Sequence, residues 1–503
     1  MKARSLMVLG TSSGAGKSVV TAGICRLLSD WGVKVAPFKA QNMSNNSYVT
    51  EDGGEIGRAQ AVQAECARVK PSVHMNPVLL KPAADNGSQA VVHGKAIGHF
   101  TAREFYAQKP KFAEAIRESY EWMASHYDVL IMEGAGSPAE INLKNNDLVN
   151  MKMAEMADAS CVLVGDIDRG GVFASLIGTL ELLDESERKR IRGFVINKFR
   201  GDASLLDDGL KYLQDRTGIP VWGVLPCDRD LRIEEEDALR VEEKQSAPDA
   251  FEGLDIAVIH LPRLSNFTDF DPIAAERGVR VRFVARPEHL GQPDLIILPG
   301  TKATLADYDY LVNHGFRQPL LEYVRGGGCL LGICGGYQMM GRRIVDPSGM
   351  DSIAGDKEGF GFLDMTTEFK PEKIVRRTSD NLSVALFGGS VKGRIEGYEI
   401  HMGRTLHHAP YAALGEGGAV HASGRIAGSY YHGLFDNPEF RCSFLESLAR
   451  LRGKYRGPLE AGLTRRAQSE AQYNRLAALL SRHLDLQALY QCLQLSPHSS
   501  STV

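Results

Sequence analysis

The segment LMVLGTSSGAGKSVV, residues 6–20, decides the fold of the first half of the chain. Its apolar start predicts a strand, its glycine-rich centre predicts a tight turn, and KSVV predicts the first turn of a helix. Glycines let backbone N–H groups point inward at an anion, and the helix N-terminus adds its dipole. Lys17 is placed to reach the β- and γ-phosphates of a nucleotide, and Ser18 to hold Mg²⁺. The segment therefore predicts a phosphate-binding loop.

The loop departs from the usual P-loop spacing. The strict pattern requires glycine where this chain has Thr11, and the glycine stands one residue earlier, at Gly10. The variant spacing resembles that of dethiobiotin synthetase and its relatives, which implies ATP as the nucleotide. An ordinary glycine-rich turn is the alternative. The preceding strand, the pair Lys17-Ser18 and the following helix argue against it.

Three further residues are expected to complete the nucleotide site. Glu133 ends an apolar strand beside glycines, where the acidic residue of a Walker B strand binds Mg²⁺; a solvated loop glutamate is the alternative. Asn197 and Lys198 lie at the end of the strand GFVIN, where related P-loop proteins recognise the purine base. The residues expected to bind ATP are Gly10, Thr11, Gly14, Gly16, Lys17, Ser18, Asn197 and Lys198, and those expected to bind Mg²⁺ are Ser18 and Glu133.

Polar, glycine-rich stretches follow several of the predicted strands, at the sheet edge where α/β proteins bind ligands. Each of their charged residues, taken alone, is explained by solvation or a salt bridge. Together they indicate a large polar substrate beside the ATP. The substrate candidates are Lys39, Lys81, Asp166, Asp168 and Arg169.

Composition is that of an ordinary globular protein. The 503 residues are 43% hydrophobic and 24% charged, and the net charge of −4 argues against a nucleic-acid surface or a polybasic membrane anchor. Because neither a signal-peptide pattern nor a long uncharged apolar stretch occurs, we expect a cytoplasmic protein. The eight cysteines form no CxxC pair, so most are expected to be reduced core residues, with Cys334 as the exception.

Two series of alternating strands and helices predict an α/β protein with two doubly wound, mostly parallel sheets. We expect a P-loop domain at residues 1–241, a linker at 242–252, a second α/β domain at 253–443, and a helical extension with a disordered tail at 444–503. In the extension, Tyr473, Leu476, Leu480 and Leu484 recur at helical spacing, which predicts packing against the body of the protein.

The second series contains GGGCLLGICGGYQMMG, residues 326–341. An apolar strand runs into a G-x-C-x-G turn before a helix, which is typical of a nucleophile elbow with Cys334 as the nucleophile. The helix N-terminus favours the reactive thiolate. Backbone N–H groups at Gly335, and near Gly300 after the strand DLIILPG, are expected to stabilise an oxyanion.

A cysteine nucleophile needs a base, and His432 in GSYYHGLFDN is the candidate. His401 is the competing histidine and is interpreted as structural or close to the substrate. Residues 253–443 resemble the class I (triad) glutamine amidotransferases, in which a glutamate stands two residues after the histidine. Here that position is Leu434, so the third member comes from elsewhere or is missing, with Glu399 as a weak candidate.

The whole chain resembles the cobyric acid synthase family. The resemblance rests on PFKAQNMSNNSYVT, NPVLLKP, EGAGSPAEINL, GDIDRGGVFAS, LPRLSNFTDFDP and GICGGYQMMG, in this order. It implies amidation of carboxylates b, d, e and g of adenosylcobyrinic acid a,c-diamide in cobalamin biosynthesis. Glutamine would yield ammonia at Cys334, and MgATP would activate each carboxylate as an acyl phosphate. No tightly bound prosthetic group, nucleic acid or membrane is expected, and the oligomeric state is open.

Three alternatives belong to neighbouring classes. Cobyrinic acid a,c-diamide synthase performs the same two reactions on an earlier corrinoid, but QNMSNNS and LSNFTDFDP are similar to the former family. A chromosome-partitioning ATPase with an inert second domain usually carries a second lysine early in its P-loop, where this chain has Ser12. A cysteine peptidase with an accessory P-loop domain would cleave peptides instead of releasing ammonia.

Overall fold

Apolar strands of the first half pair in parallel to build a six-stranded sheet, in the order β12-β11-β10-β1-β9-β2. The computed structural model describes residues 3–84, 87–228, 230–234, 251–351, 354–459 and 463–495. The strands are β1 (Arg4–Gly10), β2 (Val35–Phe38), β9 (Val129–Glu133), β10 (Ser160–Asp166), β11 (Ile191–Phe199) and β12 (Val221–Pro226). Their nearly continuous apolar sequences fit a sheet that is covered on both faces.

Alternate residues of β1 face opposite sides of this sheet, and each side has its own core. Leu6 and Val8 lie in a cluster with residues of α1, whereas Met7 and Leu9 lie in a cluster with residues of α4, α5 and α6. This two-sided packing is the doubly wound arrangement that the sequence predicts. The helices of this half are α1 (Lys17–Asp30), α2 (Arg58–Cys66), α3 (Ala102–Ala107), α4 (Lys109–His126), α5 (Met151–Ala157), α6 (Val172–Glu181), α7 (Glu185–Arg188) and α8 (Asp207–Thr217).

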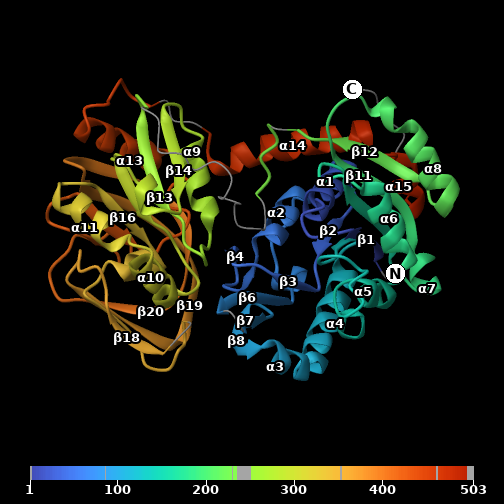
Figure 1. Ribbon diagram of the computed structural model, residues 1–503, viewed down its shortest axis with the longest axis horizontal. Helices are drawn as coiled ribbons and strands as arrows, with labels where there is room; N and C mark the ends of the chain where they lie inside the picture. Colours follow the sequence, from blue (N-terminus) through green and yellow to red (C-terminus); the bar gives the residue numbers. More distant parts are fainter. Residues whose placement is uncertain are drawn as a thin grey trace.

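The C-terminal helices α14 (Arg465–His483) and α15 (Leu486–Cys492) return to this first sheet. Figure 1 shows α14, in red, lying along the part of the molecule that contains α1 and β12. Its predicted apolar face is buried in the same core as β1 and α1: Tyr473, Leu476 and Leu480 are at most 3% exposed. The prediction that this segment packs against the body is confirmed. We call residues 3–234 with 463–495 the P-loop domain.

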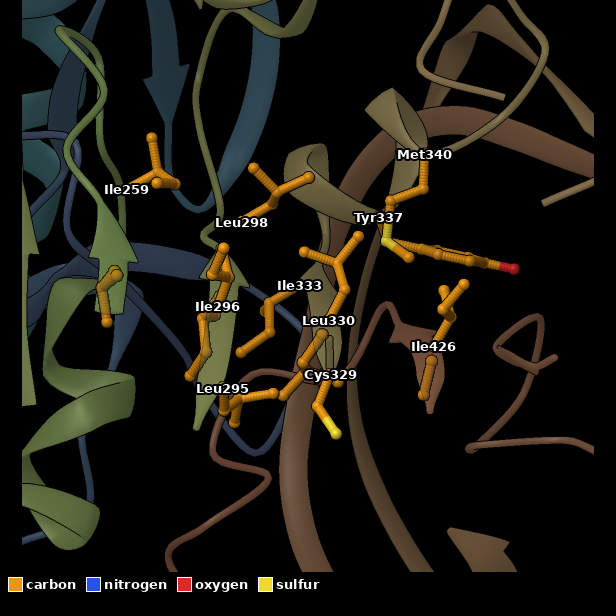
Figure 2. Packing of buried hydrophobic residues seen from close by; sticks show 14 of the residues in the cluster. Ile259, Leu295, Ile296, Leu298, Cys329, Leu330, Ile333, Tyr337, Met340 and Ile426 are labelled. Carbon is orange, nitrogen blue, oxygen red and sulfur yellow. The ribbon is translucent and has the colours of Figure 1, made fainter. Parts of the chain in front are cut away.

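The second half builds another mostly parallel sheet, in the order β14-β13-β15-β16-β22-β21, with only β21 antiparallel. Figure 2 shows apolar side chains of β15, β16 and β22, among them Ile296, Ile333 and Ile426, packed beside Tyr337. The elements are β13 (Leu254–Ile259), β14 (Val279–Val284), β15 (Leu295–Leu298), β16 (Leu330–Ile333), β21 (Ala419–Val420), β22 (Ile426–Ser429), α9 (Asp271–Ala274), α10 (Thr304–Asn313), α11 (Arg317–Arg325), α12 (Gly335–Met339) and α13 (Pro438–Leu451). The predicted fold class is confirmed. We call residues 251–459 the elbow domain.

The sequence did not predict three smaller sheets, whose strands pair mostly antiparallel. A long hairpin, β19–β20, belongs to the elbow domain, and its residues Tyr398 and Ile400 pack on Val49 of the P-loop domain. The strands of these smaller sheets are β3 (Gln41–Met43), β4 (Ser47–Val49), β5 (Glu55–Gly57), β6 (Val78–Ala84), β7 (Gly87–Val92), β8 (Lys95–Thr101), β17 (Arg343–Asp346), β18 (Gly355–Glu358), β19 (Met365–Leu386) and β20 (Gly389–His407). They bring the two domains into contact.

The predicted domain limits do not all coincide with the ends of helices and strands. Most of the predicted linker 242–252 lies outside the described residues, as does the predicted tail after 495. Helix α13 continues through position 443, so the limit predicted there falls inside a helix. Within the described residues, no helix combines the length and the apolar character that crossing a bilayer requires.

Candidate functional site

Cys334 stands on the sharp turn between β16 and α12. Its backbone angles, a φ of 49° and a ψ of −108°, lie outside the regions that residues other than glycine ordinarily adopt. The neighbouring glycines explain how this turn fits: a Cβ on Gly332 would lie 2.4 Å from the sulfur of Met340, and one on Gly336 would lie 2.0 Å from the carbonyl oxygen of Leu298. The turn is therefore a nucleophile elbow, as the spacing of small residues predicts.

His432 follows β22 and faces the elbow. Its backbone pairs with Tyr398 on β20, whose ring stacks on the imidazole. Burial opposes a charge on His432, but Asp269 and Cys334 outweigh burial and raise the pKa of His432 to about 10. The imidazole is therefore strongly disposed to take a proton from the thiol.

Asp269 is the carboxylate that orients this histidine. Its Oδ2 atom lies 2.7 Å from Nδ1 of His432, and its Oδ1 accepts a hydrogen bond of 3.0 Å from the backbone N–H of Gly433. The suggestion of Glu399 is wrong, because Glu399 accepts from Nε2 of His401 at 3.1 Å. The sequence signal for Asp269 was its place in LPRLSNFTDFDP, but nothing in that string indicates its partner.

A cavity opens between Cys334 and His432. Gln338, Lys302 and Asp351 also line it. His401 lines the cavity too, and its ring stacks on Tyr430 at 3.8 Å, which agrees with a structural role beside the substrate. Polar groups from several elements therefore surround the nucleophile.

The glycines expected at the oxyanion site flank this Cys-His pair. A Cβ on Gly300 would lie 3.0 Å from Cε1 of His432, and one on Gly335 would lie 3.1 Å from the backbone nitrogen of Thr301. Thr301 also lines the cavity, so its backbone N–H is an additional candidate donor that the sequence did not single out. The oxyanion roles of these residues stay predictions.

The P-loop has the geometry of an anion cradle. Gly14 and Gly16 have φ values of 74° and 97°, which favour glycine, and a Cβ on Gly16 would lie 2.0 Å from the side-chain nitrogen of Asn197. Lys17 is buried and donates to the backbone oxygens of Ser12 and Gly136, each at 3.0 Å. These contacts place the lysine ammonium inside the loop, where a nucleotide phosphate would meet it.

Glu133 is the centre of a buried polar cluster behind the loop. It accepts from Ser18 Oγ at 2.8 Å, from Lys39 Nζ at 3.0 Å and from Gln63 Nε2 at 2.5 Å. Burial opposes its ionisation, but Lys39 and the other donors hold the pKa of Glu133 below its usual range. An ionised carboxylate beside a hydroxyl is a set of hard oxygen ligands that suits Mg²⁺. The arrangement of Ser18 and Glu133 fits a Mg²⁺ ion, and their role in holding it stays a prediction.

Asn197 and Lys198 are tied to the loop backbone. The side-chain nitrogen of Asn197 donates to the oxygen of Ala15 at 3.1 Å, and Lys198 Nζ donates to the oxygen of Gly14 at 2.7 Å. Lys198 also pairs with Asp166 at 2.9 Å. Both residues therefore lie beside the nucleotide loop; their recognition of a purine stays a prediction.

The five substrate candidates do not form one group. Lys39 belongs to the Glu133 cluster, whereas Asp166, Asp168 and Arg169 lie beside the P-loop, with Asp168 paired to Arg200. Lys81 instead lines the cavity of Cys334 and donates to Ser47 and Glu55. The five candidates therefore belong to separate sites.

A buried ion cluster joins the domains at that cavity. Glu55 accepts from Lys81 at 2.6 Å and from Lys373 of β19 at 2.5 Å. Burial opposes the charge on Glu55, but the two lysines hold its pKa well below its usual range. Burial and the nearby lysines Lys81 and Lys302 lower the pKa of Lys373 to about 7, against the pull of Glu55. The P-loop domain thus supplies part of the wall around the nucleophile.

Comparison with known proteins identifies the family of each domain. Residues 6–241 match the family described as CobQ/CobB/MinD/ParA nucleotide binding domain, and residues 255–440 match the CobB/CobQ-like glutamine amidotransferase domain. The cobyric acid synthase of Syntrophobacter fumaroxidans is 44% identical, over 98% of this chain and 99% of its own. Those of Sorangium cellulosum and Photorhabdus laumondii are 46% and 45% identical, over 96% and 97% of this chain and 98% of each relative. The chain therefore belongs to the cobyric acid synthase family, and it pairs a nucleotide-binding domain with a glutamine amidotransferase domain.

Proposed function

We propose that this enzyme amidates carboxylates b, d, e and g of adenosylcobyrinic acid a,c-diamide, which gives adenosylcobyric acid in cobalamin biosynthesis. Glutamine would supply the nitrogen, and MgATP would activate each carboxylate. The observation that carries the proposal is the cavity of Cys334 and His432, because Lys81 of the P-loop domain forms part of its wall. A site that releases ammonia thus borders the domain that binds a nucleotide, as amide synthesis from a free acid requires.

In the glutaminase reaction, Sγ of Cys334 attacks the carboxamide carbon of glutamine. His432 takes the thiol proton and passes it to the amide nitrogen, so the C–N bond breaks and ammonia leaves a thioester behind. Asp269 keeps the imidazole oriented and stabilises its charged form. Water, deprotonated by His432, then attacks the thioester and releases glutamate and the thiol. Gly300 and Gly335 are the proposed sources of N–H donors for the oxyanion.

The same cavity offers groups for the amino-acid end of glutamine. Lys302 and Asp351 carry opposite charges and both line the cavity. Glutamine presents an α-carboxylate and an α-ammonium, so this pair matches its two charges. We therefore assign Lys302 to the carboxylate and Asp351 to the ammonium.

In the synthetase reaction, a substrate carboxylate oxygen attacks the γ-phosphorus of ATP, and ADP leaves. Ammonia then attacks the acyl phosphate carbon, loses a proton, and displaces inorganic phosphate. Lys17 would offset charge on the transferring phosphoryl group, and Ser18 and Glu133 would hold Mg²⁺, which neutralises phosphate charge when bound. Lys39 keeps Glu133 ionised for that task.

The test is to incubate the protein with glutamine, MgATP and adenosylcobyrinic acid a,c-diamide, and to follow the corrinoid by mass spectrometry. We expect stepwise exchange of carboxylate for amide, and a Cys334→Ala variant that works only with high ammonium. Cobyrinic acid as sole substrate is the second arm. Amidation of cobyrinic acid alone would instead assign the protein to the a,c-diamide synthases.

A further inference from the structure

Asn266 of the elbow domain is held by the P-loop domain. Its backbone N–H donates to Oδ1 of Asn46 at 2.8 Å, and its Oδ1 accepts from the backbone N–H of Ser47 at 3.1 Å. Asn266 has a φ of 52°, in the left-handed region, and all three residues are buried. Two hydrogen bonds from the other domain thus fix both the backbone and the side-chain amide of Asn266.

The side-chain NH₂ group of Asn266 lies beside the catalytic base His432. Nδ2 of Asn266 lies 3.2 Å from Nε2 of His432. Because Oδ1 is occupied by the N–H of Ser47, the NH₂ group must face the imidazole. An NH₂ group can donate only to an Nε2 atom without a proton. When its imidazole is neutral, His432 therefore donates through Nδ1 to Asp269 and accepts at Nε2, the atom that must also receive the thiol proton of Cys334. Asp269 and Cys334 raise the pKa of His432 and so favour the imidazolium form, whereas the amide of Asn266 opposes it.

We propose that Asn266 is a positioning residue through which the P-loop domain restrains the glutaminase. The inference rests on the proposed glutaminase function of Cys334 and His432. While Asn46 and Ser47 hold Asn266 in place, its amide competes with the thiol for Nε2 and opposes the imidazolium form. Movement of these two residues releases Asn266, and the proton can then pass from Cys334 to His432.

The restraining residues lie on a segment that also reaches the nucleotide site. Residues 39–47 begin at Lys39, which pairs with Glu133, and end at Ser47, whose Oγ donates to Glu55 and accepts from Lys81. A nucleotide with its Mg²⁺ adds charge directly beside Lys39 and Glu133. A shift of this segment on nucleotide binding would therefore move Asn46 and Ser47, the residues that hold Asn266.

The experiment measures hydrolysis of glutamine alone, without ATP or corrinoid, in the full-length protein. We expect Asn266→Ala and Asn46→Ala each to raise this basal rate by about three- to tenfold. This factor corresponds to the free energy of one hydrogen bond. We also expect MgATP and corrinoid to stimulate glutamine hydrolysis in the wild type, and this stimulation to be lost in both variants. Arg377→Ala is the matched control: it breaks another contact between the domains, to Tyr48, and should leave the basal rate unchanged.

A second readout separates restraint from structural support. The groups that face His432 include Asp269, Cys334 and Tyr398, and burial and the neighbouring Asp269 raise the pKa of Tyr398, so it stays neutral. Without the amide of Asn266, the thiolate-imidazolium pair should form at lower pH, so the pH midpoint of Cys334 alkylation by iodoacetamide should fall. A lower basal rate or an unchanged midpoint in Asn266→Ala would overturn the inference. Absence of glutamine hydrolysis in the wild type would overturn the proposed function instead.

Discussion

The Nδ1 atom of His432 lies 2.7 Å from Oδ2 of Asp269, a residue 163 positions earlier in the chain. The pair restores a complete nucleophile-base-carboxylate constellation in a chain where Leu434 stands at the usual glutamate position. Leu434 is 1% exposed and belongs to the hydrophobic core of the elbow domain. The carboxylate therefore comes from the loop that contains Asp269, and Leu434 packs in the core.

Replacement of Asp269 by Asn should slow glutamine hydrolysis, because the amide no longer stabilises the charged imidazole. We expect a loss of about 10²- to 10⁴-fold in kcat/KM for glutamine, the range for an impaired general base. Amidation with ammonium should persist. Steady-state assays with each nitrogen donor measure both rates, and Glu399→Gln, which alters the partner of His401, serves as the comparison. An equal loss in both variants would contradict the assignment of Asp269.

The ion pair of His432 predicts a pH dependence of stability. The folded state raises the pKa of His432 from 6.5 to about 10 through Asp269 and Cys334, against burial. Its stabilising contribution is therefore fully present below pH 6.5 and is lost as the pH rises through about 10. Urea unfolding of the wild type and of His432→Gln across this window measures the difference. A difference that stays constant with pH would show that no proton is bound more tightly in the folded state.

Replacement of Glu133 by Gln should separate the two reactions. It removes the carboxylate that we assign to Mg²⁺ and breaks the buried ion pair between Glu133 and Lys39. We expect amidation to fall about 10²-fold or more with either glutamine or ammonium, since phosphoryl transfer depends on charge compensation. The thiol and His432 are untouched, so iodoacetamide should still alkylate Cys334. Retention of full synthetase activity would remove Glu133 from the metal site.

The close packing of the elbow predicts that Gly336 tolerates no side chain. A Cβ there would lie 2.0 Å from the backbone oxygen of Leu298, so Gly336→Ala must displace β15 or α12. We expect loss of glutaminase activity and destabilisation by about 1–3 kcal/mol, as for an overpacked core. Gly178, inside α6, has no atom within 4 Å of its Cβ position, and Gly178→Ala is the control. Thermal unfolding of both variants should show a lower Tm for the first alone.

The parts of the site that the sequence predicted are those built from neighbouring residues. Strand, turn and helix meet within a few positions at both Lys17 and Cys334, so spacing alone indicates their geometry. His432 could be predicted because it follows a strand-like run and lies downstream of the cysteine elbow. The apolar face of α14 was likewise visible as a helical repeat.

The parts that were missed depend on contacts across the chain. Asp269 and Asn266 stand in one short string, but each acquires its role only when that loop meets His432, and no local pattern encodes that meeting. The hairpin β19–β20 was missed because its strands carry many charged residues on their exposed faces. Lys81 was grouped with the nucleotide site because its segment is polar and glycine-rich. It lies within β6, in a separate mixed sheet whose residue Gln89 contacts Lys373 of the other domain.

The most direct test follows nitrogen itself. Glutamine labelled with heavy nitrogen in its side-chain amide is supplied with MgATP and adenosylcobyrinic acid a,c-diamide, in the presence of unlabelled ammonium too dilute to support the Cys334→Ala variant. We expect the new amides of the corrinoid to carry the label in the wild type, and Cys334→Ala to form no labelled product. Corrinoid amides without label in the wild type, formed while labelled glutamine is hydrolysed, would contradict it, because the nitrogen released at Cys334 would then not be the one that enters the product.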